Sequence, residues 1–131
     1  MEERKIESFE DLDVWKFCRQ LRKELEELVK AFPQEEKYRL SDQIIRAARR
    51  VTACIAEGYG RYHFQENIQF CRQSRGSQYE NIDHLITAFD NKYIDQIKLE
   101  YYKKKCISAI KLLNGYIRFL KKEKEKSEYK K

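Results

Sequence analysis

Residues 14–32 read VWKFCRQLRKELEELVKAF, and this stretch decides the fold class. Its apolar residues recur at alternating gaps of four and three, which places them along one face of an amphipathic helix. They are Val14, Cys18, Leu21, Leu25, Leu28 and Phe32. We predict a helix over about 9–32, with Ser8 and Asp11 forming a capping box at its start. Pro33 should end it, because proline cannot continue a helix.

The same spacing recurs three more times and predicts helices over about 41–59, 64–90 and 94–122. The third apolar stripe begins at Phe64 and carries Arg75 and Gln78 in its middle, so this helix should have a polar waist. The fourth stripe breaks in phase around residues 103–105, and its expected core positions are Ile97, Tyr101, Ile107, Ile110, Leu113, Ile117 and Leu120. Short links between helices of similar length favour antiparallel neighbours. We therefore expect residues 1–131 to form one all-α domain, an antiparallel up-down-up-down four-helix bundle.

The composition excludes several other classes of protein. The chain has only one Pro and four Gly in 131 residues, far fewer turn residues than a β-sandwich or barrel requires. No apolar run approaches the roughly 18 residues of a membrane span, and residues 1–9 do not resemble a signal peptide. The four cysteines occur singly, which argues against a disulfide framework. We expect a soluble cytoplasmic protein with reduced thiols.

The net charge of +6 favours polyanionic partners such as RNA. Part of this charge lies in residues 121–131, which alternate Lys with Glu and end in two lysines. We expect residues 123–131 to form a charged tail beyond the last helix. The tail either keeps the protein soluble, which we favour, or contacts phosphates.

The sequence gives no support to a catalytic, metal or cofactor site. Tracing heights along the predicted bundle places Cys18, Cys54 and Cys71 near one end and Cys106 midway along its helix, so the four thiols do not share a layer. A site of three thiolates is the alternative, but single cysteines usually behave as small buried hydrophobes. The two histidines, at positions 63 and 84, have no partner at catalytic or ligand spacing.

Basic residues on the second, third and fourth helices and in the turn after the second helix are the candidate nucleic-acid contacts. Arginine suits this role because its planar guanidinium can bond two phosphate oxygens. The candidates are Arg49, Arg61, Arg72, Arg75, Lys103 and Lys104. A second set should serve structure or subunit contacts, as a polar network bordering the core: Gln43, Arg46, Glu57 and Glu80. A third hypothesis is an enzyme that binds a small dianion through the arginines, with Glu57 or Glu80 as acid or base.

Two further features of the sequence allow alternative interpretations. Tyr59, Tyr62 and Phe64 interleave with Arg61 in the second connection, and such aromatic residues either stack on unpaired bases or plug the end of the bundle. We favour the plug, because Phe64 lies on the core stripe. Gly76 interrupts the third helix at a cost of about 1 kcal/mol, which suggests that another helix approaches closely there.

Residues 43–61 read QIIRAARRVTACIAEGYGR, which resembles the signature of the four-helix-bundle proteins encoded within intervening sequences of bacterial 23S ribosomal RNA genes. Further matches occur at the chain's opening, at Phe32 and Pro33, and in 66–80, where Gly76 and Ser77 fall at family spacing. The resemblance spans nearly the whole chain. The sequence departs from it at Arg50, where the family usually has Ser, and at Cys54, where it usually has Asn.

The resemblance implies a non-enzymatic bundle that assembles into a ring-like homopentamer and binds nucleic acid. A related branch resembles the accessory variability protein of diversity-generating retroelements, which binds a reverse transcriptase and its RNA. We therefore expect an oligomeric protein that binds RNA in preference to DNA, or a ribonucleoprotein accessory protein with a reverse transcriptase as its partner. The alternative is a protein-interaction scaffold that binds no nucleic acid.

Overall fold

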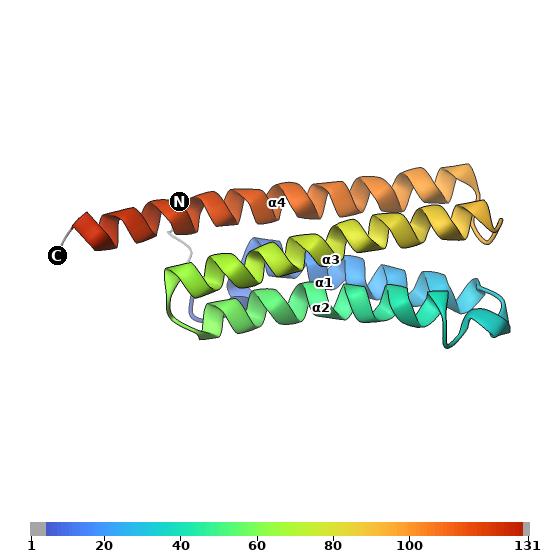
Figure 1. Ribbon diagram of the computed structural model, residues 1–131, viewed down its shortest axis with the longest axis horizontal. Helices are drawn as coiled ribbons and strands as arrows, with labels where there is room; N and C mark the ends of the chain where they lie inside the picture. Colours follow the sequence, from blue (N-terminus) through green and yellow to red (C-terminus); the bar gives the residue numbers. More distant parts are fainter. Residues whose placement is uncertain (1–4, 130–131) are drawn as a thin grey trace.

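The computed structural model describes residues 5–129 and shows four long helices (Figure 1). They are α1 (Asp13–Leu28), α2 (Leu40–Gly60), α3 (Phe64–Asp90) and α4 (Gln96–Tyr129). Three short 3-10 segments surround α1: η1 (Phe9–Asp11), η2 (Val29–Ala31) and η3 (Gln34–Glu36). Residues 5–129 contain no β-strand.

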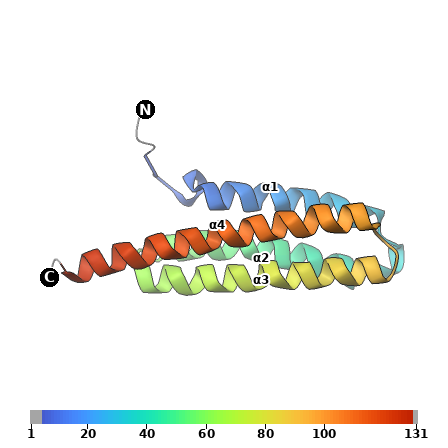
Figure 2. The ribbon, with the colours of Figure 1, turned by 90° about the horizontal axis from the view of Figure 1, so that it is seen from above.

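The helices run alternately in opposite directions, and each packs against its two neighbours in a closed ring (Figures 1 and 2). α3 lies between α2 and α4 and packs most extensively against both, whereas the contact between α1 and α4 is sparser. This arrangement confirms the predicted all-α, up-down-up-down four-helix bundle.

The core contains apolar side chains from all four helices. Leu21, Ile55, Leu85 and Leu113, one from each helix, are almost completely buried. Burying a side chain of this size contributes roughly 1.5–3 kcal/mol. The stripes read from the sequence therefore do meet along the axis of the bundle.

The fourth stripe differs from the prediction over its first half. Ile97 is 79% exposed and Tyr101 is 46% exposed, and Ile107 is also exposed. Leu99, Cys106 and Ala109 are buried instead. The buried positions of α4 therefore keep a regular helical spacing, without the predicted phase break. The prediction was wrong here because α4 packs against both α1 and α3, and the side of the helix that carries Leu99 faces them, whereas the side that carries Ile97 and Tyr101 does not.

The ends of the first and last helices also differ from the expected bounds. Ser8 and Asp11 form the predicted capping box, but it caps η1, and α1 itself covers only Asp13–Leu28. α4 continues to Tyr129 instead of ending near 122. Lys126 contacts Glu123 at 3.3 Å on this extension, and such pairs support a helix. The rest of the expected tail, residues 130–131, lies outside the described residues.

The glycines in α2 and α3 serve different purposes. A Cβ added to Gly58 would lie 2.8 Å from Asn67 Oδ1 and 2.9 Å from Phe70 Cβ, so α2 and α3 can approach this closely only because residue 58 is glycine. A Cβ added to Gly76 would meet no atom within 4 Å. The expected close approach at Gly76 is therefore absent within a single chain.

Polar groups interrupt the core along α3. Ser74 donates a hydrogen bond of 2.8 Å to the carbonyl of Val51, and Gln78 contacts Cys18 Sγ at 3.9 Å. Asn81 is completely buried, and neither its Oδ1 nor its Nδ2 has a hydrogen-bond partner among residues 5–129. The polar waist predicted for this helix is present, and it contains an amide whose burial is not offset by hydrogen bonds.

The cysteines behave as buried hydrophobes. Burial raises the pKa of Cys18, Cys71 and Cys106 to about 12, so these thiols stay protonated at neutral pH. All four cysteines are free and buried. No three or more His, Cys, Asp or Glu residues within 5–129 are arranged to hold a metal ion.

Candidate nucleic-acid interface

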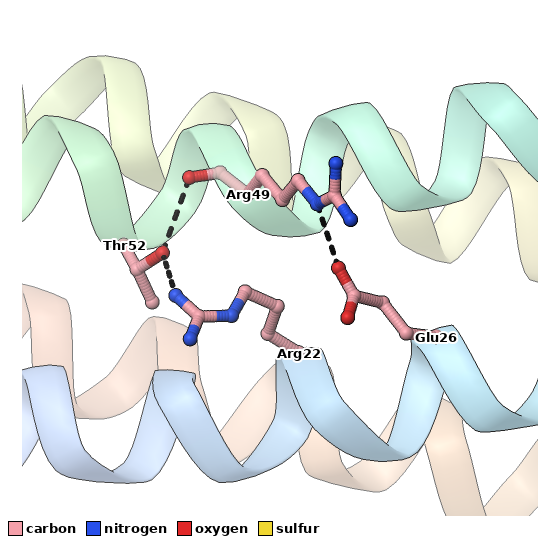
Figure 3. Close-up of polar contacts among 4 residues, drawn as sticks. All are labelled: Arg22, Glu26, Arg49 and Thr52. Atoms are coloured by element: carbon pink, nitrogen blue, oxygen red, sulfur yellow. Dashed lines mark hydrogen bonds and ion pairs between the residues drawn. The ribbon is translucent and has the colours of Figure 1, made fainter.

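Arg49 lies at the seam between α1 and α2, where a short polar chain joins the two helices (Figure 3). Its Nε contacts Glu26 Oε1 at 2.7 Å. One turn away, Arg22 donates a hydrogen bond of 2.8 Å to Thr52 Oγ1, and Thr52 donates to the carbonyl of Arg49 at 3.1 Å. The side chain of Arg49 is 67% exposed, so the pair contributes at most about 1 kcal/mol. Arg49 is thus engaged in holding α1 against α2.

The residues expected to form a polar network along the core form separate local pairs instead. Arg46 contacts Asp42 at 2.9 Å, and His84 contacts Glu80 at 3.0 Å, each within one helix turn. Glu57 pairs with Arg61 at 3.1 Å, also at i,i+4. Gln43 lies exposed on α2. The two arginine pairs lie on the surface, whereas His84 is largely buried, and no ion pair among the described residues links Arg46, Glu57 and Glu80 to one another.

Arg61 caps the end of α2 and begins the turn into α3. Besides its pair with Glu57, its guanidinium lies 5.3 Å from the centre of the Phe70 ring. The ring and the carboxylate together fix the side chain beside the turn. About half of the side chain stays exposed and can reach an anion.

Arg72 lines a groove of about 290 Å³ between the first turns of α3 and the last turns of α4. The groove is lined by Gln65, Ile68, Arg72, Lys121, Lys124, Glu125 and Glu128. Lys124 Nζ donates to Gln65 Oε1 at 2.9 Å and lies 3.9 Å from Glu128. Arg72 and Lys121 form no ion pair with any residue that the structure describes. We call this set of residues the α3–α4 groove.

Arg75 lies one turn further along α3, on the side that faces α4. Its Nη1 donates a hydrogen bond of 2.8 Å to Asn114 Oδ1. Lys103 precedes Asn114 by three helix turns and therefore faces the same side of α4, while Lys104 is fully on the outer surface. Of the six predicted contacts, Arg72 and Arg75 lie close together, Arg61 lies at the adjoining end, and Arg49 belongs to the α1–α2 seam.

The basic candidates named from the sequence did not include Lys121 and Lys124, because the charged run that contains them was interpreted chiefly as a solubilising tail, with phosphate contact as the less favoured alternative. The available signal was their spacing: they lie seven and ten residues after Asn114, which is two and three turns along one face of a continuous helix. This spacing becomes visible only when the fourth helix is taken to continue through the charged residues that follow Leu120.

The turn between α2 and α3 does not form the expected aromatic plug. Tyr62 is 87% exposed, and Phe64, which was assigned to the core stripe, is 37% exposed. Tyr59 alone packs against the core, and its ring centre lies 6.4 Å from that of Tyr62. The plug fails because Tyr62 lies just past the end of α2 and Phe64 begins α3, and neither ring packs against the core cluster.

An apolar stripe runs along the outside of α4. Its members are spaced by whole turns, at Ile97, Tyr101, Leu112 and Phe119, and all are at least 39% exposed. Beside the last two, a groove of about 480 Å³ separates α4 from the segment before α1, and Ile6 and Leu12 line its other wall. Within residues 5–129, none of the helices combines the length and hydrophobicity needed to cross a bilayer.

Comparison with known proteins places this arrangement in a family. The model for the 23S rRNA-intervening sequence protein matches residues 10–115. The chain belongs to this family. The match confirms the resemblance read from the sequence, and it includes Arg61, Arg72 and Arg75 but ends before Lys121.

A solved structure has a fold similar to that of this chain. It is a protein of unknown function from the S23 ribosomal protein family of Bacteroides thetaiotaomicron VPI-5482. The two chains are 21% identical and superpose with a TM-score of 0.74, over 80% of this chain and 95% of the other. No curated protein matches the chain.

Proposed function

We propose that this chain is a non-enzymatic cytoplasmic protein that binds RNA through the α3–α4 groove and works as an oligomer, as a ribosomal RNA or ribonucleoprotein accessory factor. The observation that carries the proposal is Arg72, which lies in the groove without a carboxylate partner among the described residues. Lys121 and Lys124 share the groove with it. A guanidinium without a carboxylate partner, in a groove that two lysines also line, is available to phosphate oxygens.

The balance of charge supports this use of the groove. Three cationic side chains line it against two carboxylates, those of Glu125 and Glu128. Arg75 adds a cation one turn away, and the whole chain carries +6. A protein with this excess attracts polyanions over several ångströms, and the attraction weakens as salt rises.

Binding of a fluorescein-labelled RNA hairpin, measured by anisotropy at several salt concentrations, tests the proposal. Wild type should bind at low salt, and the logarithm of its affinity should fall linearly with the logarithm of the salt concentration. Arg72→Glu combined with Lys121→Glu should lower the affinity about tenfold or more and flatten the salt slope by about two.

Arg46→Glu combined with Lys30→Glu is the matched control, because it changes the net charge by the same amount at two exposed residues outside the groove, which pair with Asp42 and Glu27. The control should bind RNA nearly as wild type does. If wild type shows no binding at low salt, the proposal is wrong. Equal losses in the control and the groove variant would point to net charge and not to the groove.

The apolar stripe on α4 favours a second candidate function, assembly with a second copy of this chain or with a partner protein. Exposed apolar residues at whole-turn spacing on one helix are typical of a surface that packs against another helix. The family resemblance predicts five copies. Light scattering measures the mass directly, and Phe119→Glu should reduce it by placing a charge in the stripe, while Tyr38→Glu at the other end of the bundle should not. A monomeric wild type would exclude assembly between copies.

A further inference from the structure

The turn between α2 and α3 presents aromatic rings to solvent at the end of the bundle where the α3–α4 groove opens. Tyr62 is 87% exposed, and Phe64 two residues later is 37% exposed. We propose that this turn stacks on unpaired bases of single-stranded RNA, with Tyr62 as the platform. The inference rests on the proposed RNA binding and adds which part of the RNA is recognised.

The backbone conformation at Tyr62 indicates that the turn does not require an aromatic side chain at this position. Its φ is 58°, in the left-handed region that follows the end of α2. Glycine adopts this conformation without strain and is the usual residue just past a helix end, whereas a residue with a side chain is disfavoured there. The Tyr62 ring therefore occupies a position where the fold favours glycine, and the nearest aromatic ring, Tyr59, covers little of it.

A cation is fixed beside the exposed ring. Arg61 precedes Tyr62 and is held by Glu57 at 3.1 Å and by the Phe70 ring at 5.3 Å. Proteins that bind single-stranded nucleic acid combine aromatic rings, which stack on bases, with basic groups that hold the backbone. The turn supplies both in adjacent residues.

The turn is continuous with the α3–α4 groove. Gln65 follows Tyr62 by three residues, lines the groove and accepts a hydrogen bond from Lys124. The last turns of α4 extend past this turn, so their lysines lie at the same end of the molecule (Figure 1). A single RNA strand whose phosphates contact Arg72, Lys121 and Lys124 would thus bring its bases next to Tyr62.

The test uses two fluorescein-labelled probes of equal length, an oligouridylate and a ribose-phosphate chain without bases. Tyr62→Gly removes the ring and suits the left-handed backbone, so its melting temperature should equal or exceed that of wild type. It should bind the oligouridylate about tenfold more weakly than wild type, which is within the usual effect of losing one stacked base. Its affinity for the probe without bases should be unchanged, and Tyr62→Phe should retain binding to both.

Tyr38→Ala is the matched control, because Tyr38 is 82% exposed but lies before α2 at the opposite end. It should bind both probes as wild type does. If wild type binds RNA and Tyr62→Gly binds the oligouridylate equally well, the stacking inference is wrong while the groove proposal stands. If wild type binds neither probe nor the hairpin, both are wrong. A lower mass of Tyr62→Gly by light scattering would assign the ring to contacts between copies and would also overturn the inference.

Discussion

Replacing Asn81 by leucine should raise the free energy of unfolding by about 2 kcal/mol. Asn81 is completely buried in α3, and neither atom of its amide has a hydrogen-bond partner within residues 5–129. The amide therefore loses its hydration on folding without compensation. Leucine has the same number of side-chain heavy atoms in the same branched arrangement, and it loses no hydrogen bond. Denaturation in urea, followed by circular dichroism, measures the change.

Asn67 provides the matched control for this substitution. It is also buried on α3, but its Nδ2 donates to Tyr116 Oη at 3.3 Å and its Oδ1 accepts from Cys71 Sγ at 3.6 Å. Asn67→Leu should lower stability, because it removes these bonds and leaves Tyr116 without its partner. A loss of stability in Asn81→Leu as well would contradict our account and show that the Asn81 amide is hydrogen-bonded in solution.

Gly58→Ala should lower the free energy of unfolding by about 1–3 kcal/mol, although alanine is the better helix former. The added methyl would lie within 3 Å of Asn67 Oδ1 and Phe70 Cβ, and 3.2 Å from the carbonyl of Asn67. A backbone carbonyl and a Cβ cannot rotate out of the way. α2 and α3 must therefore move apart at the end of the bundle that carries Arg61. Thermal and urea unfolding both report the loss.

The same substitution at Gly76 should have the opposite effect. Gly76 is exposed in the middle of α3, and an added Cβ meets nothing within 4 Å. Gly76→Ala should therefore stabilise the isolated chain by about 0.5–1 kcal/mol through helix propensity alone. If both variants lost stability equally, close packing at Gly58 would not be the cause.

The sequence predicted the helices well because each helix must present one apolar face, and that periodicity is a local property. Leu21, Val51 and Ile110 are all buried as their spacing required. The error at Ile97 and Tyr101 has a different origin. Which apolar face of α4 turns inward depends on how the helix packs against α1 and α3, and the periodicity of α4 alone does not determine that choice.

The candidate site was only partly predictable, because it depends on contacts between helices. The sequence identified Arg72 and Arg75 but gave no means of knowing that Glu26 on α1 would engage Arg49. Such pairs follow from the register between helices, which short links constrain only loosely. The prediction of an aromatic plug was wrong for a related reason. Tyr62 is a large aromatic residue of a kind that often packs in a core, but its position just beyond the end of α2 leaves its side chain in solvent.

The closed ring of helices bears on how the chain folds. Three of the four helix contacts join sequence neighbours through short turns, so little chain entropy is lost in forming them. The contact between α1 and α4 joins distant parts of the sequence and is also the sparsest. We therefore expect the hairpins around α3 to form the nucleus of the folding transition state, and the docking of α1 onto α4 to be the late step that completes the domain.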